Sequence, residues 1–138
     1  LDLAGTGMEL GSHTINHAPL ALIDPKYLPW EVGTAKKRLE EKLIDYKVKG
    51  MAYPNGGYNE KVIGALKEYD YEYGLTGKVG ANTYQTFRQR PYEMYRISIV
   101  DDGNGLEGLK RRLERAYIWG YLQTKGIDLN ILRDLLMQ

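Results

Sequence analysis

The spacing of apolar residues predicts an alternation of strands and helices along most of the chain. Apolar positions recur every three or four residues over 30–46, the pattern of an amphipathic helix. A second helix is predicted from Asn59, a good N-cap, to about residue 69, and a third over 106–121. Strands are predicted at 8–11, 47–53, 71–76 and 94–100, and a short final helix over 128–137. This order indicates an α/β layer with largely parallel strands.

Turn-forming residues mark the connections between these elements. The strand predicted at 47–53 runs into Pro54-Asn55-Gly56-Gly57, a strong breaker and therefore a tight loop. The polar stretch 77–90 is too long for an ordinary connection, so we expect a loop that belongs to a functional site. Asp101-Asp102, followed by Gly and Asn, is interpreted as a turn.

Composition narrows the class of protein without identifying it. The length of 138 residues suits one domain, and 43% hydrophobic with 27% charged residues is ordinary for a soluble globular protein. The net charge of +1 gives no footprint for nucleic acid, and the basic clusters at 36–38 and 110–112 are followed by glutamates, which indicates mixed solvated faces. We expect no nucleic-acid partner and no membrane span. The absence of cysteine excludes disulfides and thiolate zinc sites within these residues.

The two histidines of the chain, His13 and His17, are its main candidate for chemistry. They are four residues apart, a spacing that places two side chains on one face of a helix or helical turn. Two imidazoles so placed can bind one metal ion. The alternative is two polar residues at the junction of a loop and a helix, without a metal. A catalytic site also needs a third ligand, commonly a carboxylate, which the neighbouring sequence does not reveal.

The segment Gly11-Ser12-His13-Thr14-Ile15-Asn16-His17 resembles the metal-binding motif of the polysaccharide deacetylases, the NodB-homology or carbohydrate esterase family 4-like domains. The segment Tyr53-Pro54-Asn55-Gly56, in the expected order and at the expected distance, resembles the Tyr-Pro-x-Gly loop that walls the substrate groove in that family. The similarity covers roughly residues 5–117. It implies part of an irregular (β/α) barrel that lacks its first strands, as a single partial domain over 1–138 with a C-terminal helical tail over 118–138.

The resemblance also implies roles for these residues. His13 and His17 would be ligands of a divalent metal, usually Zn²⁺, and the backbone around Asn55 and Gly56 would lie near a developing oxyanion. Pro54 belongs to the same loop, and Tyr53 and Tyr58 could line the groove. For Tyr53, core packing is an equally good interpretation. The substrate would be a polysaccharide, and the location extracellular or in the cell envelope.

The chain departs from the family pattern in ways that affect catalysis. The Asp-Asp motif that supplies the general base and the third ligand does not precede the histidines, and Asp101-Asp102 comes after them. No histidine follows residue 17, so the late general acid of many members is also missing. We therefore assign no catalytic residue within these 138 positions.

Two explanations of this departure stay open. The chain begins with Leu1 rather than methionine, so we expect it to start inside a longer parent protein. That parent would be a metal-dependent deacetylase of an N- or O-acetylated polysaccharide, with this chain inactive as it stands. The alternative is a non-catalytic carbohydrate-binding or structural module derived from a deacetylase. A sheet without its first strands would expose edges, which favours pairing with another copy or a partner.

Overall fold

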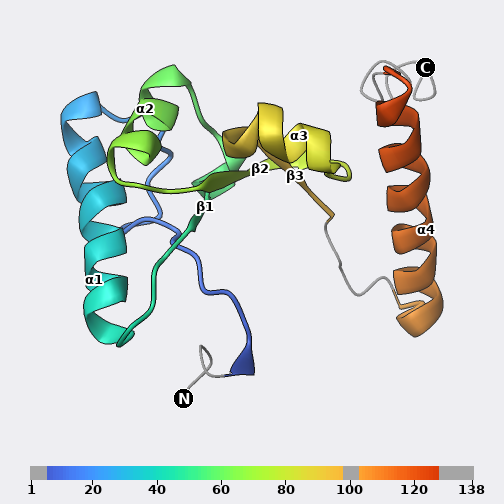
Figure 1. Ribbon diagram of the computed structural model, residues 1–138, viewed down its shortest axis with the longest axis horizontal. Helices are drawn as coiled ribbons and strands as arrows, with labels where there is room; N and C mark the ends of the chain where they lie inside the picture. The colour runs from blue at the N-terminus through green and yellow to red at the C-terminus, as the bar shows by residue number, and fades with distance from the viewer. Residues whose placement is uncertain (1–5, 98–102, 128–138) are drawn as a thin grey trace. The chain divides into compact units, whose positions relative to one another are not determined.

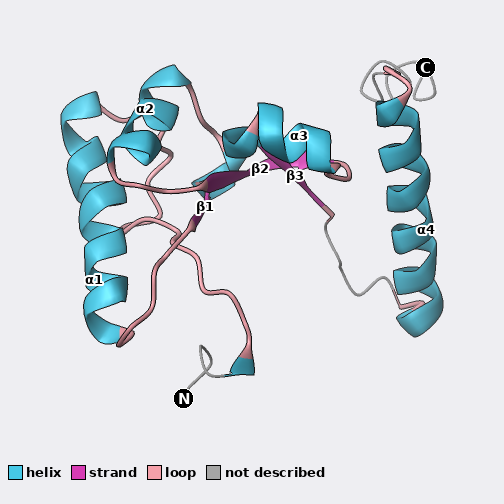
Figure 2. Ribbon diagram, in the orientation of Figure 1, coloured by secondary structure: helices cyan, strands magenta, loops and turns pink. Residues whose placement is uncertain are grey.

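The computed structural model describes residues 6–97 and 103–127 (Figure 1). The helices and strands labelled in Figure 2 are α1 (Ala35–Lys42), β1 (Gly50–Ala52), α2 (Glu60–Glu68), β2 (Tyr73–Val79), α3 (Tyr84–Gln89), β3 (Met94–Arg96) and α4 (Gly105–Thr124). The described residues form two compact units. The first comprises those up to Gly77 together with Arg90–Met94, and the second comprises Lys78–Gln89 with those from Tyr95 onward.

The strands form a three-stranded sheet in the order β1-β2-β3. β1 and β2 are parallel, with Met51 opposite Gly74, and α2 makes the crossover between them. On the other side of β1, Ser12 forms a single parallel bridge to Met51. Its N–H donates to Gly50 O at 2.8 Å, and its carbonyl accepts from Ala52 N at 2.9 Å. The predicted α/β class with parallel strands is confirmed.

The core of the first unit lies between the sheet and the helices α1 and α2. Asn59 caps α2, its side chain accepting from Val62 N at 3.1 Å, as its position in the sequence predicts. The buried hydrophobic cluster consists of residues of β1 and α2 and of the segments that precede α1 and flank β1 and α2: Leu20, Leu28, Val32, Val48, Met51, Tyr53, Val62, Ala65, Leu66 and Tyr71. Burial of each large aliphatic side chain contributes about 1.5–3 kcal/mol, so this cluster is the main source of stability.

The helix predicted over 30–46 forms, with a π-helical start, but ends early. A π-helical turn, η3 (Pro29–Thr34), precedes α1, which ends at Lys42 because Leu43 leaves the helical region with φ −107° and ψ 89°. Tyr46 still packs against the core, but from a loop. Beyond Lys42 the apolar spacing is therefore satisfied by burial without a helix.

Two other predictions are corrected. Residues 8–11 form no strand, and only the bridge at Ser12 joins the sheet. The stretch 77–90, predicted as a loop, contains the end of β2 and the helix α3. Thr83 begins that helix by accepting from Thr86 N at 3.1 Å, a capping signal that the predicted loop overlooked.

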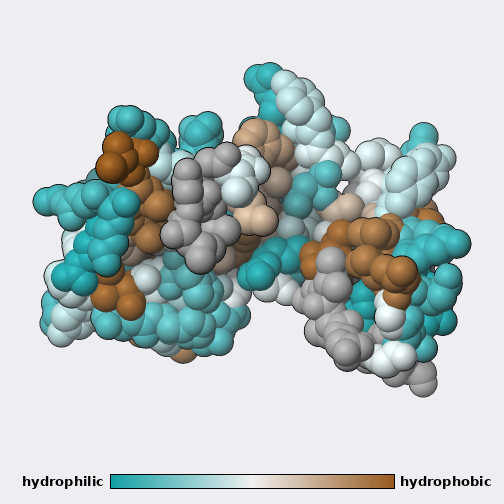
Figure 3. All heavy atoms as spheres, turned by 90° about the horizontal axis from the view of Figure 1, so that it is seen from below, coloured by the Kyte–Doolittle hydropathy of each residue, from teal (hydrophilic) through white to brown (hydrophobic). Residues whose placement is uncertain are grey.

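The remaining predictions are confirmed in part or concern residues outside the described ranges. Of the predicted strand at 94–100, β3 covers 94–96, and 98–100 lie outside the described residues; α4 extends the predicted helix 106–121 at both ends. The Asp101-Asp102 turn and the helix at 128–137 lie outside the described residues. Among the residues that are described, no helix is long and apolar enough to cross a membrane. Figure 3 shows a largely hydrophilic face with several apolar patches, and α4 itself exposes Leu106, Leu113 and Tyr117.

The loop after β1 depends on backbone that favours glycine. Within the 3₁₀ turn η4 (Pro54–Gly56), Asn55 and Gly56 are both left-handed, with φ of 54° and 70°. A Cβ on Gly56 would lie 2.4 Å from Gly77 N, so the turn also packs directly on the backbone at the end of β2. Both the dihedral angle and the contact exclude a larger residue here.

We expect Gly56→Ala to lower the free energy of unfolding by more than about 1 kcal/mol, because it combines a strained φ with a backbone clash. Gly64→Ala is the matched control, since Gly64 is exposed inside α2 and a Cβ there meets nothing within 4 Å. That variant should gain about 0.5–1 kcal/mol. Urea unfolding of both variants measures the difference, and equal effects would contradict the packing described for Gly56.

A buried tyrosine predicts how stability depends on alkaline pH. Tyr71 is 2% exposed and donates its hydroxyl to Val32 O at 3.1 Å, and burial raises its pKa to about 12. An unfolded tyrosine titrates near pH ~10, so the folded chain holds this proton more tightly. The resulting stabilisation is complete below pH ~10 and is lost as the pH rises toward about 12.

We therefore expect Tyr71→Phe to flatten the decline in the free energy of unfolding between pH ~10 and ~12. Urea unfolding at a series of pH values measures this slope. Tyr117→Phe, at an exposed position of α4, serves as the control and should leave the slope unchanged. A Tyr71→Phe slope equal to that of the wild type would refute the assignment.

Candidate functional site

His13 directly follows the residue that joins the sheet, and its ring is held by the neighbouring strand. The Nδ1 atom lies 2.7 Å from the carbonyl oxygen of Ala52, the last residue of β1. Because a carbonyl oxygen only accepts, Nδ1 is the protonated nitrogen of this pair. In the neutral tautomer with this bond the lone pair is on Nε2, and the His13 side chain is exposed.

The segment between the histidines is an irregular loop rather than a helical turn. Thr14 and His17 both have left-handed backbone, with φ of 67° and 55°. The predicted helical geometry of the pair is therefore wrong. The rings nevertheless meet, with centroids 4.8 Å apart and planes at 74°. Left-handed non-glycine residues cost roughly 1–3 kcal/mol each, so the surrounding contacts must hold this loop in place.

Glu31 supplies those contacts, and the sequence did not single it out. Its side chain is buried, and its Oε2 accepts from Ile15 N at 3.1 Å and from Asn16 N at 3.0 Å. Its Oε1 accepts from Asn16 Nδ2 at 2.7 Å. Burial acts to raise the pKa of Glu31, but the bonds from Asn16 and Ile15 outweigh it and hold that pKa below the usual value. The only sequence signal was a carboxylate early in a predicted helix, which normally indicates a solvated position.

The tyrosines of the loop after β1 are tied into the protein. Tyr53 is 1% exposed, stacks on Tyr58 with centroids 5.1 Å apart, and donates its hydroxyl to Tyr92 O at 2.8 Å. Burial raises the pKa of Tyr53 well above its ordinary value. Of the two interpretations of Tyr53, the structure favours core packing over lining a groove. Tyr58 is half-buried and donates to Glu93 Oε1 at 2.8 Å.

The same loop brings backbone groups close to the histidine segment. His13 bonds the carbonyl of Ala52, and the chain continues from there into Pro54, Asn55 and Gly56. The N–H of Gly56 donates to Tyr53 O at 2.9 Å, which closes the turn. Of the two residues predicted near an oxyanion, Asn55 is therefore the remaining backbone candidate. Both segments follow the carboxyl ends of parallel β pairings, the usual place for sites in such sheets.

The donor set suits two ligands of a divalent metal but not a complete site. Anchored at Nδ1 by a carbonyl, His13 has the arrangement typical of metal-binding histidine. Within the described ranges 6–97 and 103–127, no group of three His, Asp or Glu residues lies close enough to hold an ion. The sequence-predicted pair is thus brought together in space, without a third ligand from the described part of the chain.

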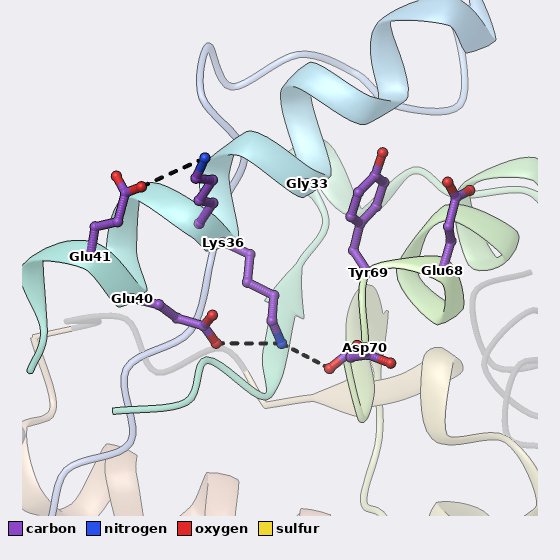
Figure 4. Close-up of a pocket in the computed structure, with 8 residues that line it drawn as sticks. Gly33, Lys36, Glu40, Glu41, Glu68, Tyr69 and Asp70 are labelled. Atoms are coloured by element: carbon purple, nitrogen blue, oxygen red, sulfur yellow. Dashed lines mark hydrogen bonds and ion pairs between the residues drawn. The ribbon is translucent and has the colours of Figure 1, made fainter. Parts of the chain in front are cut away.

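A separate surface hollow lies along α1 and the end of α2 (Figure 4). Lys36 crosses it and donates to Val48 O at 2.6 Å and Asp70 O at 2.8 Å, with Glu40 at 3.6 Å. Exposed Lys37 pairs with Glu41 at 3.8 Å. Lys36 and Lys37 thus pair with glutamates, whereas Arg38 lies over the Trp30 ring, and Lys36 joins three segments of the fold rather than lying on a solvated face. The hollow includes no residue of the histidine segment or of the loop after β1.

Comparisons with known proteins agree with this arrangement. The family model for polysaccharide deacetylase matches residues 2–74. YxkH of Bacillus subtilis (strain 168), whose name refers to the same family, is 29% identical over 104 residues, which are 75% of this chain and 36% of that protein. The chain thus spans about a third of this relative.

Solved structures show the same similarity. The deacetylase PplD of Streptococcus pyogenes, solved in complex with acetate, has a TM-score of 0.64 and 25% identity, covering 74% of this chain and 43% of that one. BC0361, a polysaccharide deacetylase from Bacillus cereus, has a TM-score of 0.67 and 26% identity, covering 79% of this chain and 33% of that one. The fold is therefore part of a NodB-type deacetylase domain. From the matched residues and the shared fold, the chain belongs to the polysaccharide deacetylase family.

Proposed function

We propose that the protein of which this chain forms part removes acetyl groups from an N- or O-acetylated polysaccharide, with His13 and His17 as two ligands of a zinc ion. The observation that carries the proposal is the contact of the two rings beside the loop after β1. Family membership supports deacetylation as the reaction. A cell-wall or extracellular glycan is the proposed substrate, which implies an envelope or extracellular location.

Each described residue has a defined part in this proposal. The bond from His13 Nδ1 to Ala52 O selects the tautomer of the neutral ring that carries its lone pair on Nε2, and it fixes the plane of the ring. The chemistry that the ion supplies when bound is polarisation of the acetyl carbonyl and a lower pKa for water. The backbone N–H of Asn55 is the proposed donor to the oxyanion that develops on the acetyl oxygen. The left-handed turn holds that group in place before the substrate binds.

We further propose that the isolated chain has little or no activity. No carboxylate completes the ligand set within its described part. The chain corresponds to about a third of YxkH, so we place the third ligand and the general base in other segments of the parent protein. A carbohydrate-binding or structural module without catalysis is the alternative, and the missing third ligand is the observation that favours it.

The test compares the parent protein with its histidine variants. Bound zinc is measured after dialysis, and acetate release is measured with acetylated chito-oligosaccharide. We expect zinc in the wild type, and its loss together with a decrease in activity of at least about 100-fold in His13→Ala and His17→Ala. Lys37→Ala, at an exposed position of the surface hollow along α1, is the control and should retain both.

The outcomes separate the two functions. A parent protein that binds no zinc, or that releases acetate equally well in both histidine variants, would contradict the enzyme proposal. Binding of the oligosaccharide without acetate release would favour the non-catalytic module. The isolated 138-residue chain is assayed alongside, and full activity there would refute its proposed dependence on other segments.

A further inference from the structure

We infer that Glu31 is a positioning residue for the histidine pair: its buried carboxylate holds the loop that sets the distance between His13 and His17. The inference rests on the proposed metal-binding role of these histidines. Glu31 itself touches neither ring in the contacts described for it. Its partners are the backbone of Ile15 and Asn16 and the side chain of Asn16, which lie between the two histidines.

Three hydrogen-bond donors of the loop between the histidines bind the carboxylate of Glu31. The left-handed conformation of Thr14 turns the next two backbone N–H groups to the same side, where Oε2 accepts both at 3.1 and 3.0 Å. Successive N–H groups in such a turn form a natural concavity for an anionic oxygen. Asn16 Nδ2 adds the third bond, at 2.7 Å to Oε1. Both carboxylate oxygens of the buried Glu31 side chain therefore accept hydrogen bonds from this loop.

The position of Glu31 in the fold makes this contact rigid. Glu31 lies in the π-helical turn η3, directly before the core residue Val32, which is fully buried. π-Helical turns are often retained at functional sites because they redirect a side chain. At the other end of the motif, Ser12 is paired to β1 and His13 to Ala52 O. The loop is thus anchored before the first histidine by the sheet and before the second by Glu31.

A second carboxylate of the same helical segment provides a matched control. Glu40, in α1, accepts from the backbone N–H of Val48 at 2.9 Å and is paired with Lys36. It resembles Glu31 in holding a backbone amide from another segment. Its partners belong to the connection before β1, however, and not to the histidine loop. If Glu31 only stabilised the fold, replacing Glu31 and replacing Glu40 would affect the histidine pair equally.

The experiment replaces each carboxylate by an apolar side chain of similar length. Glu31→Met removes both acceptors from the loop, and Glu40→Met makes the same change at the control site. Glu31→Gln is the conservative variant: its oxygen accepts the two backbone bonds, and its amide pairs with a rotated Asn16 side chain. Because the chain has two histidines, their ring signals are resolved in NMR spectra of the full 138-residue chain. Zinc chloride is the probe.

We expect Glu31→Met to weaken zinc binding roughly 10- to 100-fold, the usual effect of losing a group that orients metal ligands. Glu31→Gln should recover most of the affinity, and Glu40→Met should bind zinc as the wild type does. In the metal-free protein, the nuclear Overhauser contacts between the two rings should disappear in Glu31→Met alone. Thermal unfolding records whether each variant remains folded.

Other results of the same experiment would overturn the proposed role of Glu31. A folded Glu31→Met that keeps the wild-type zinc affinity and ring contacts overturns the inference, as does an equal loss in Glu40→Met. If Glu31→Met does not fold, Asn16→Ala removes one donor only, and an unchanged affinity there overturns it. If zinc leaves the wild-type histidine signals unmoved, the two histidines do not bind zinc without the other segments of the parent protein, and the ring contacts in the metal-free variants still decide the role of Glu31.

Discussion

Two hydrogen bonds at Ser12 determine where the candidate chemistry of this chain is located. They pair one residue with β1 in the parallel direction, so that the histidine segment and the loop after β1 leave the sheet at the same edge. The register of that pairing places His13 against the carbonyl of Ala52. A shift by one residue would turn the side chains to the opposite face and separate the ring from this acceptor. The site thus depends on a pairing too short to count as a strand.

The backbone at this edge is strained, and specific contacts compensate for it. Thr14, His17 and Asn55 are left-handed without being glycine, a conformation that costs roughly 1–3 kcal/mol each. The Thr14 turn is stabilised by the two backbone bonds to Glu31, and the Asn55 turn by the close approach of Gly56 to Gly77. Elsewhere the unit has a capped helix and one buried hydrophobic cluster. Three of the five left-handed non-glycine residues among the described positions thus lie in the segments that carry the proposed function, and the other two, Asp45 and Asp70, lie in turns after α1 and α2.

The sequence predicted best those elements whose signals are local. In α2, the cap at Asn59 and the apolar spacing of Val62, Ile63 and Leu66 act within a few residues, and both were found as predicted. The helix expected over 30–46 failed at its end, because Tyr46 reaches the core from a loop and so imitates helical periodicity. The pattern of apolar positions records burial, and it indicates secondary structure only where the backbone between buried residues is regular.

The site was predictable only to the level of its motifs. The spacing of His13 and His17 suggested proximity through a helical turn, whereas the rings meet across an irregular loop. Nothing local distinguishes Glu31 from a solvated acid, because its burial follows from donors 15 and 16 positions earlier in the chain. Tyr53 was undecided for the same reason, since its partner Tyr92 is 39 residues away. Long-range hydrogen bonds, rather than propensity, determine these roles.

The loop after β1 shows how such long-range constraints restrict the chemistry available. Gly56 is required by its packing on Gly77, and the turn that accommodates it uses the Gly56 N–H for the carbonyl of Tyr53. The Gly56 N–H could serve either the turn or an oxyanion, and in this structure it is bonded within the turn. The backbone N–H of Asn55 is the remaining candidate donor, because the turn orients it but does not use it in the bond to Tyr53 O. Asparagine tolerates left-handed backbone better than most residues, so this position accommodates the turn at lower cost.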